Sequence, residues 1–312
     1  MIGRGGRLGR ALVACVALAS GEASALAANG FDAQNWKPAL DPYGYVTVEG
    51  ARSLRSLQPH VALYFDWAHN PLEFAEPRPG GFGRDVIRDL AQLDLVAGIG
   101  LLSIGKHAGL EIGADLPIAL DENGLRVGFD PVTGKPDGLE ETGFGNLRTA
   151  VKLTALDRED DPIGIAARIE LQWPTGRESD FLSNDGHVTP VFGLIVEKKL
   201  GPVRFGIQCQ YEHIPGHIEV AGVTVDDKVK LGAGLALEPF DQTKLPLGFV
   251  LEAFHWFRAC NPWKAEAEAP VEIGAAVKYG GTLFAALGVN FGLNKGVGSP
   301  DERLFAALGI AF

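Results

Sequence analysis

The residues of this 312-residue chain that could do chemistry are charged side chains placed at alternate positions along short segments. Successive side chains of an extended strand point to opposite faces, so such charges gather on one face. Opposite charges on neighbouring strands would form a paired network that fills an interior, or a charged ring that selects solutes in a narrow polar channel. The sequence leaves both open. The charges that we predict to line this interior are Asp66, Glu111, Asp115, Arg148, Lys152, Arg168, Glu170, Arg204, Glu212, Lys230, Glu272, Lys278 and Arg303.

Hydrolytic chemistry has less support. His213, His217, His255 and Ser183 lie near the ends of predicted strands, where an outer-membrane lipase or protease would place such groups. Nucleophile and base must be brought together in space, and no spacing here marks such a set. The two cysteines beyond residue 27 lack metal-ligand spacing, and the acidic segments follow no calcium-loop pattern. We therefore expect no enzyme activity, no metal site and no cofactor.

The elements that must position these charges are extended segments. Blocks of about ten residues alternate between apolar and polar positions, which is the pattern of β-strands. Two blocks are less regular, because 188–199 alternates poorly and 247–257 carries apolar residues on both faces. The twelve predicted strands are His60–His69, Leu93–Ser103, Leu110–Leu120, Leu147–Leu156, Ile163–Trp173, Val188–Lys199, Val203–His213, Val229–Leu237, Leu247–Phe257, Val271–Tyr279, Leu283–Leu293 and Leu304–Phe312.

The connections between these strands alternate between long and short. Long segments such as 70–92 and 121–146 are followed by short ones such as 104–109 and 157–162. Outer-membrane barrels have short periplasmic turns and longer extracellular loops, and a sandwich has no reason to sort its connections this way. The sequence predicts an all-β protein: a transmembrane, antiparallel, up-and-down β-barrel of about 12 strands over residues 60–312. Its apolar residues would form a stripe that faces lipid instead of a core.

Aromatic residues gather near the predicted strand ends, as expected of girdles at the two membrane interfaces. The last block places apolar residues at every second position up to a terminal aromatic, which resembles the signal read by the barrel assembly machinery. The girdle residues are Trp67, Trp173, Tyr211, Trp256, Tyr279, Phe291 and Phe312, and the assembly signal comprises Leu304, Ala306, Leu308, Ile310 and Phe312.

The first residues predict export. Residues 1–27 contain three arginines, a short apolar run and an Ala25-Leu26-Ala27 cleavage site, with Ala23-Ser24-Ala25 as the alternative site. Residues 28–59 would form an N-terminal periplasmic arm or a partial plug of the lumen, and we favour an extension packed under the barrel. The net charge of −11 argues against nonspecific binding to nucleic acids.

Residues 31–72 resemble a known family. Phe31-Asp-Ala-Gln-Asn-Trp-Lys-Pro-Ala-Leu-Asp-Pro, Tyr45-Val-Thr-Val-Glu-Gly-Ala-Arg52 and Trp67-Ala-His-Asn-Pro-Leu72 are similar to the opening of the β-barrel domain of OmpA-like bacterial outer-membrane proteins. The resemblance implies a membrane barrel without catalytic residues. In that family a peptidoglycan-binding domain often follows the barrel, and this chain ends at Phe312, so peptidoglycan anchoring is not expected of it.

Two functions fit this sequence. The first is a porin-like protein of the bacterial outer membrane that lets small hydrophilic solutes pass, passively or selectively. The second is a structural or surface-interaction barrel with a closed lumen, which acts in envelope integrity or adhesion through its extracellular loops. The expected partners are outer-membrane lipid and lipopolysaccharide, and the barrel assembly machinery during insertion. The sequence does not predict the solute, the oligomeric state or whether the lumen conducts.

Overall fold

The computed structural model describes residues 31–73, 85–129, 136–138, 142–177, 180–183, 186–216, 218–220, 223–238, 246–262 and 268–312. The predicted signal peptide lies outside these residues, as does His217. None of the helices found among the described residues has the length and apolar character needed to cross a membrane.

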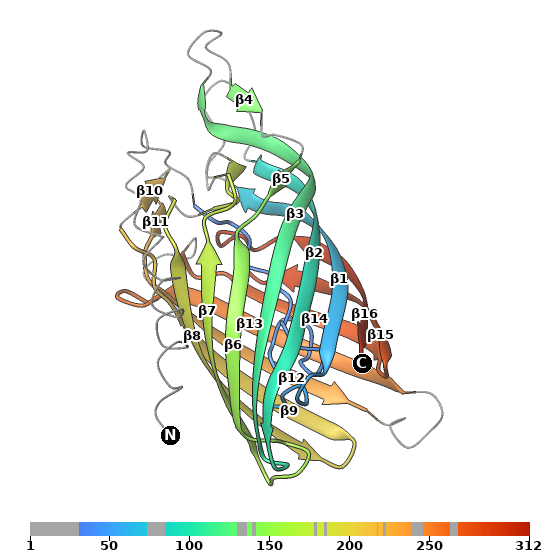
Figure 1. Ribbon diagram of the computed structural model, residues 1–312. Helices are drawn as coiled ribbons and strands as arrows, with labels where there is room; N and C mark the ends of the chain where they lie inside the picture. Colours follow the sequence, from blue (N-terminus) through green and yellow to red (C-terminus); the bar gives the residue numbers. More distant parts are fainter. Residues whose placement is uncertain are drawn as a thin grey trace, which may run out of the picture.

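Strands that pair antiparallel close into a barrel, which confirms the predicted fold (Figure 1). Each wall strand pairs with the next wall strand along the chain, and β1 pairs with β16 to complete the ring. The twelve wall strands are β1 (Pro59–Glu73), β2 (Asp85–Ile104), β3 (Ala108–Phe129), β6 (Leu147–Leu156), β7 (Gly164–Trp173), β8 (Thr189–Leu200), β9 (Val203–Glu212), β12 (Lys228–Leu237), β13 (Leu247–Arg258), β14 (Val271–Tyr279), β15 (Leu283–Gly292) and β16 (Glu302–Ala311). A closed ring leaves no unpaired strand edge.

Within the described parts of the long connections lie four short strands. β4 (Pro136–Gly138) and β5 (Gly143–Phe144) pair with β3, and β10 (Ile218–Val220) pairs with β11 (Val223–Val225). All of them belong to the end of the barrel that carries the long connections, which is the top of Figure 1. We call this the long-loop end and the opposite one the short-turn end.

The first three wall strands are longer than the alternation predicts. β2 and β3 contain 20 and 22 residues, and both continue beyond the blocks at 93–103 and 110–120 towards the long-loop end. Register shifts interrupt their pairing there, for example between Ala91 and Gln92. A bulge changes which residues share a face, so strict alternation ends where the bulge begins. The sequence pattern therefore underestimates these strands.

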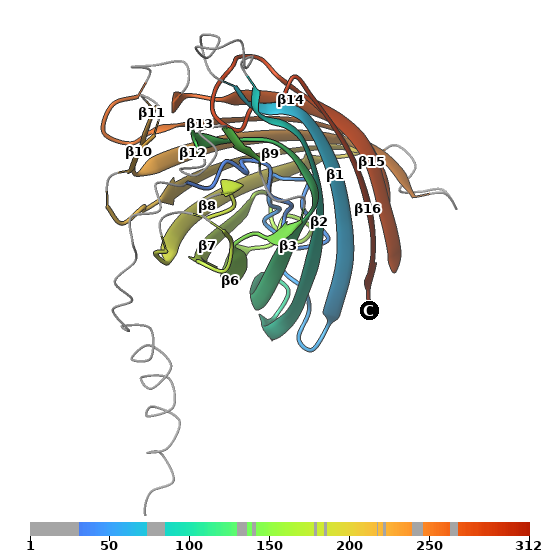
Figure 2. The same ribbon diagram turned by 90° about the horizontal axis from the view of Figure 1, so that it is seen from above.

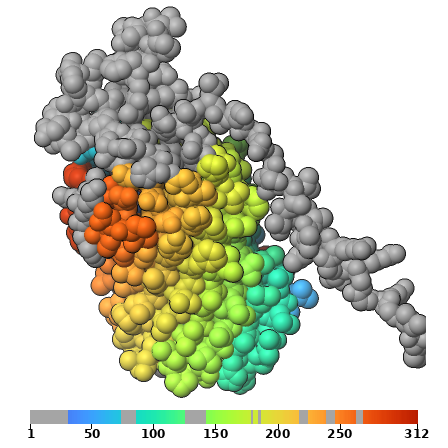
Figure 3. Space-filling model, turned by 90° about the vertical axis from the view of Figure 1, so that its left-hand side faces the viewer, coloured from blue at the N-terminus to red at the C-terminus, as the bar shows by residue number. Residues whose placement is uncertain are grey.

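The wall is apolar on its outer face and carries buried charged residues on its inner face. In β9, Phe205 and Ile207 are exposed on the outside, whereas Arg204 and Gln208 are buried inside. Figure 3 shows how neighbouring strands form one continuous outer wall. Cys209 lies on this outer face of β9, and both it and Cys260 are free thiols.

Most of the predicted girdle residues lie on the outer face. Trp67 and Trp173 are half-buried there, and the more exposed ones are Tyr211, Tyr279, Phe291 and Phe312. Trp256 is the exception, because it points inward and is only 5% exposed. Its assignment to a girdle is wrong: β13 carries apolar residues on both faces, and Trp256 belongs to the inner one.

The barrel also contains an apolar core, so the prediction that its apolar residues only face lipid is wrong. The core joins Trp36 and Tyr45 to inward-facing residues such as Phe254, Trp256 and Phe305. These wall residues belong to β13 and β16, whereas charged residues dominate the inner faces of β3, β6 and β7. The interior is therefore apolar along one arc and charged along another.

The outward-facing residues of β8 provide a test of the membrane interpretation. Leu194, in the middle of β8, and Leu200, at its end, are 63% and 64% exposed. We expect Leu194→Arg to lower the free energy of unfolding by about 2–4 kcal/mol and Leu200→Arg by about 0–1 kcal/mol, because the cost of a charge peaks at the bilayer midplane. Urea unfolding in phospholipid vesicles measures both, and equal effects would contradict a membrane-embedded outer face.

Candidate functional site: the barrel interior

A separate segment of the chain occupies the interior. Residues 31–58, which we call the inner segment, precede β1 and lie inside the ring of strands, in blue in Figure 2. At the long-loop end, the amide of Ala33 donates a hydrogen bond to the carbonyl of Phe181 at 3.0 Å. At the short-turn end, the amide of Leu57 donates to the carbonyl of Gly100 at 2.8 Å. The segment therefore extends through the lumen instead of packing under the barrel.

The inner segment is buried although it forms no regular secondary structure. It turns back on itself near Tyr45, where the Ala39 amide donates to the Val46 carbonyl and the Tyr45 amide donates to the Val48 carbonyl, both at 2.8 Å. Pro38 and Pro42 lack the amide hydrogen that a sheet ladder requires. The other buried amides and carbonyls need partners of a different kind.

Carboxylates of the wall accept hydrogen bonds from these amides. Glu252 of β13 accepts from three consecutive amides, including those of Thr47 at 3.0 Å and Val48 at 3.1 Å, and also from the Thr47 hydroxyl. Glu111 of β3 accepts from Leu54 at 2.6 Å. These carboxyl groups supply the partners that a sheet ladder would otherwise give to the amides of the inner segment.

Cations of the wall donate to the carbonyls of the same segment. Lys152 of β6 donates to the Arg52 carbonyl and to the Asp41 carboxylate, each at 2.9 Å. Lys278 of β14 donates to the Gly44 carbonyl at 2.7 Å. Together the wall charges satisfy both kinds of backbone group in the inner segment.

Wall residues also pair with one another across neighbouring strands. Arg148 of β6 contacts Asp115 of β3 at 3.0 Å and Glu170 of β7 at 3.3 Å. Lys152 contacts Glu111, which lies directly opposite on β3, at 2.8 Å. The further pairs are Arg168 with Glu170, Arg168 with Glu49 of the inner segment, Arg303 with Asp66, Arg303 with Glu272, and Arg204 with Glu197.

All the charges that we predict to line the interior point inward, and Lys278 alone of them is half-buried instead of buried. The ion pairs bring most of them together. Among the described residues, Glu212, Lys230 and Lys278 have no ion-pair partner within 4.0 Å. Lys230 instead lies over the rings of Phe254 and Trp256, at 4.7 and 5.1 Å from their centroids.

Two wall carboxylates that hold the inner segment are not among the charges predicted from the sequence. Glu197 of β8 accepts from the Ala51 amide at 2.8 Å. Glu252 is the second, and the two glutamates lie on the two strands with the least regular alternation. Arg158, which lies in the turn before β7 and contacts Glu197 at 2.8 Å, was not predicted either. An isolated acidic residue at an inward position of β8 and β13 is the signal that could have identified both glutamates.

Glycines of the wall make room for Tyr45. The ring of Tyr45 lies against Gly206 of β9 and Gly234 of β12, where an added Cβ atom would approach it to 2.7 and 2.6 Å. The guanidinium of Arg204 lies 4.2 Å from the centroid of the same ring. Any larger side chain at these two glycines would displace Tyr45.

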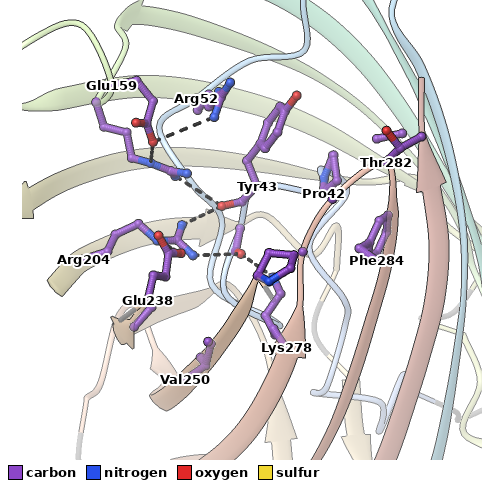
Figure 4. Close-up of a pocket in the computed structure, with 18 of the residues that line it drawn as sticks. Pro42, Tyr43, Arg52, Glu159, Arg204, Glu238, Val250, Lys278, Thr282 and Phe284 are labelled. Carbon is purple, nitrogen blue, oxygen red and sulfur yellow. Dashed lines mark hydrogen bonds and ion pairs between the residues drawn. The ribbon is translucent and has the colours of Figure 1, made fainter. Parts of the chain in front are cut away.

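The inner segment leaves a cavity of about 470 Å³ at the short-turn end, which we call the mouth cavity. Figure 4 shows Arg52 and Glu159 on one side of it and Lys278 on the other, with Tyr43 between them. Arg158 and Arg204 both donate to the Tyr43 carbonyl, at 3.2 and 2.6 Å. The inner segment and the wall therefore line this cavity together.

Glu159 of the turn before β7 is shared by three cations. Its carboxylate lies 3.8 Å from Arg52, 3.2 Å from Arg158 and 3.2 Å from Lys199. Partial burial raises the pKa of the Glu159 carboxyl, but the three cations outweigh this effect and hold the pKa below its usual range. Glu159 is therefore ionised at neutral pH.

The residues considered for hydrolysis lie apart from this cavity. His213 contacts Asp227 at 2.9 Å at the long-loop end, and His255 bonds to the Pro270 carbonyl at 3.1 Å. The Ser183 hydroxyl is buried and has no hydrogen-bond partner among the described residues. Within the same residues, no group of three His, Cys, Asp or Glu side chains could hold a metal ion.

Comparison with known proteins supports the fold. No family model and no curated protein matches the chain. An outer-membrane channel from Pseudomonas putida F1 is 13% identical and superposes with a TM-score of 0.60 over 87% of this chain and 99% of that chain. The NanC porin is 8% identical, with a TM-score of 0.47 over 81% of this chain and 98% of that chain. At such identities a likeness shows the fold alone, and no match supports the finer resemblance to OmpA-like proteins.

The contact between Tyr45 and Gly234 yields a test of the packed interior. We expect Gly234→Ala to destabilise the seated inner segment by about 1–3 kcal/mol, the usual cost of an extra methyl group in a packed core. Amide hydrogen exchange of residues 44–50 should then become roughly tenfold faster or more.

Gly248→Ala is the matched control, because it also faces inward but its added Cβ atom would meet no atom closer than 3.4 Å. Equal amide exchange rates of residues 44–50 in the two variants would contradict the packing of the Tyr45 ring against Gly234.

Proposed function

We propose that this protein is an outer-membrane channel whose lumen is closed by the inner segment and opens when that segment moves. The observation that carries the proposal is how the segment is held. Residues 31–55 belong to no wall strand. Wall side chains hold them through hydrogen bonds, which Glu252 accepts and Lys152 donates. Water can replace such bonds one at a time, so the segment can move without breaking the barrel.

The character of the wall supports passage of small hydrophilic solutes. Its inner arc carries acidic and basic residues, such as Glu111, Lys152 and Arg168, which suit a water-filled path when the segment is absent. Its apolar outer face suits the outer membrane, with lipid and lipopolysaccharide as surroundings and the barrel assembly machinery acting during insertion. A closer relation to OmpA-like proteins stays a prediction.

A second function, a structural or surface-interaction barrel with a permanently closed lumen, is favoured by one observation. The inner segment is buried as deeply as a protein core, since Val48 and Ala51 are both 0% exposed. A barrel that never opens would act in envelope integrity or adhesion through its long loops. The two functions differ in whether removing the segment creates a path for ions.

Deletion of residues 31–55 separates these functions. We expect the deletion variant to conduct in planar bilayers with a current several times that of the full chain, because the lumen then loses its filling. The heat-dependent shift in gel mobility that folded barrels show serves as the folding control. A folded deletion variant that passes no current would contradict the channel and favour the structural barrel.

A further inference from the structure

The wall holds the backbone of the inner segment along a continuous stretch. Every residue from Tyr43 to Arg52 has an amide or a carbonyl that is hydrogen-bonded to a side chain of a wall strand. Backbone amides and carbonyls are common to all polypeptides, so these contacts depend little on the sequence of the segment. The wall side chains that make them are Lys152, Glu197, Arg204, Gln208, Glu252 and Lys278.

The two kinds of backbone group meet two kinds of wall side chain in turn. Lys278 donates to the carbonyls of Gly44 and Tyr45, at 2.7 and 2.5 Å. Glu252 then accepts from the amides of residues 46–48. An inorganic ion carries charge of one sign and would engage only the donors or only the acceptors. A row of donors followed by a row of acceptors matches a peptide backbone.

The wall also contains a recess that accepts an aromatic ring. The recess lies at Gly206 and Gly234, where an added Cβ atom would come within 2.7 and 2.6 Å of the Tyr45 ring. The guanidinium of Arg204 lies 4.2 Å from the centroid of that ring, which adds a cation–π contact. The recess therefore favours a peptide with an aromatic side chain at this position.

Carboxylates on both sides of Tyr45 pair with wall cations. Four residues before it, the Asp41 carboxylate lies 2.9 Å from the ammonium group of Lys152. Four residues after it, the Glu49 carboxylate pairs with the guanidinium of Arg168. Both carboxylates are buried, so the two cations are also reached from inside the lumen. A peptide with acidic residues at these two distances from an aromatic one would reproduce both ion pairs.

The lumen has room for a polypeptide. The inner segment extends from Ala33, which bonds to Phe181 at the long-loop end, to Leu57, which bonds to Gly100 at the short-turn end (Figure 2). Within this length it also turns back on itself near Tyr45. The space that the segment leaves when it moves is therefore wide enough for a peptide chain.

We propose that the wall residues that hold the inner segment form a binding site for short peptides, and that the segment occupies this site in the closed channel. The preferred peptide has an aromatic residue with acidic residues four positions before and after it, as Asp41, Tyr45 and Glu49 have in the segment. The inference rests on the proposed channel and names a class of solute for it. A bound peptide takes over the hydrogen bonds of the segment and so favours the open state.

Binding of a synthetic peptide to the full chain tests the proposal. The probe is a fluorescein-labelled peptide with the sequence of residues 41–54, and fluorescence anisotropy in detergent measures its binding. The protein carries Tyr45→Ala, which empties the recess and leaves the wall intact. We expect saturable binding that is about 10-fold or more tighter than binding to the parent protein, because the parent's own Tyr45 competes with the probe.

The heat-dependent shift in gel mobility shows whether each variant is folded. Tyr45→Leu, which keeps part of the packing, takes the place of Tyr45→Ala if that variant does not fold.

Changes in the probe test recognition of the backbone. N-methylation at the positions of Thr47 and Val48 removes two amide hydrogens that Glu252 accepts. We expect this probe to bind about 10-fold more weakly or worse, since hydrogen bonds to a charged group are lost. N-methylation at the position of Arg52 is the control, because among the described residues no wall side chain accepts from that amide and only the Arg52 carbonyl is held.

A methyl group in the recess tests where the probe binds. In the Tyr45→Ala protein, Gly234→Ala should weaken binding of the probe by about 5-fold or more, because the added carbon meets the tyrosine ring of the probe. The shortened side chain of the segment no longer fills the recess, so competition from the segment is unchanged. Gly248→Ala, whose added Cβ atom would meet no atom closer than 3.4 Å, should leave binding as it was.

Four results would overturn the inference. They are absence of saturable binding to the Tyr45→Ala protein, equal binding to this variant and the parent, equal binding of the two N-methylated probes, and equal effects of Gly234→Ala and Gly248→Ala. Because anisotropy requires no ion current, failure here leaves the bilayer test of the channel unaffected. A deletion variant that passes no current would refute the channel and leave the peptide site in place.

Discussion

The structure depends on how the buried backbone of the inner segment finds hydrogen-bond partners. A segment without helix or strand exposes amides and carbonyls that would be costly to bury unpaired. The buried charged side chains of the wall need partners as well, because an ionised side chain away from water is stable only when it is paired and hydrogen-bonded. Glu252 with the amides of residues 46–48, and Lys152 with the carbonyl of Arg52, meet both requirements at once.

This mutual requirement explains the division of the interior into two arcs. The charged residues of β3, β6 and β7, together with Glu252 of β13, hold the backbone of the inner segment, whereas the apolar residues of β13 and β16 pack against its large side chains. Trp36 lies 5.5 Å from Phe305 of the apolar arc, measured between ring centroids. Gly206 and Gly234 leave the space that Tyr45 fills. A lumen designed for water alone would need neither the apolar arc nor these glycines.

The fold could be predicted from the sequence because strand periodicity is a local property. β9 shows it best, since Arg204, Gln208 and Glu212 alternate with lipid-facing residues and all three point inward. The inward direction of the predicted charges followed from the same period. The lengths of β2 and β3 could not be predicted from this period, because bulges end the alternation before the strands end.

The content of the interior could not be predicted, because it depends on contacts between residues that lie far apart in the sequence. Nothing local in residues 31–58 indicates that Glu252 accepts a hydrogen bond from the Val46 amide, because the two residues are 206 positions apart in the sequence. Trp256 shows the same limit. Two apolar faces on β13 give no local sign of which one meets lipid and which one meets the inner segment.

In the proposed channel, ions pass only when the inner segment moves away from the wall residues that hold it. Ser53 of the segment and Thr154 of β6 have their hydroxyl oxygens 2.6 Å apart, so a Ser53→Cys/Thr154→Cys pair can form a disulfide between segment and wall. In a background with the native cysteines replaced by serine, single-channel recording should show no openings in the oxidised protein and restored openings after reduction. The same current before and after reduction, or no current in either state, would contradict the account.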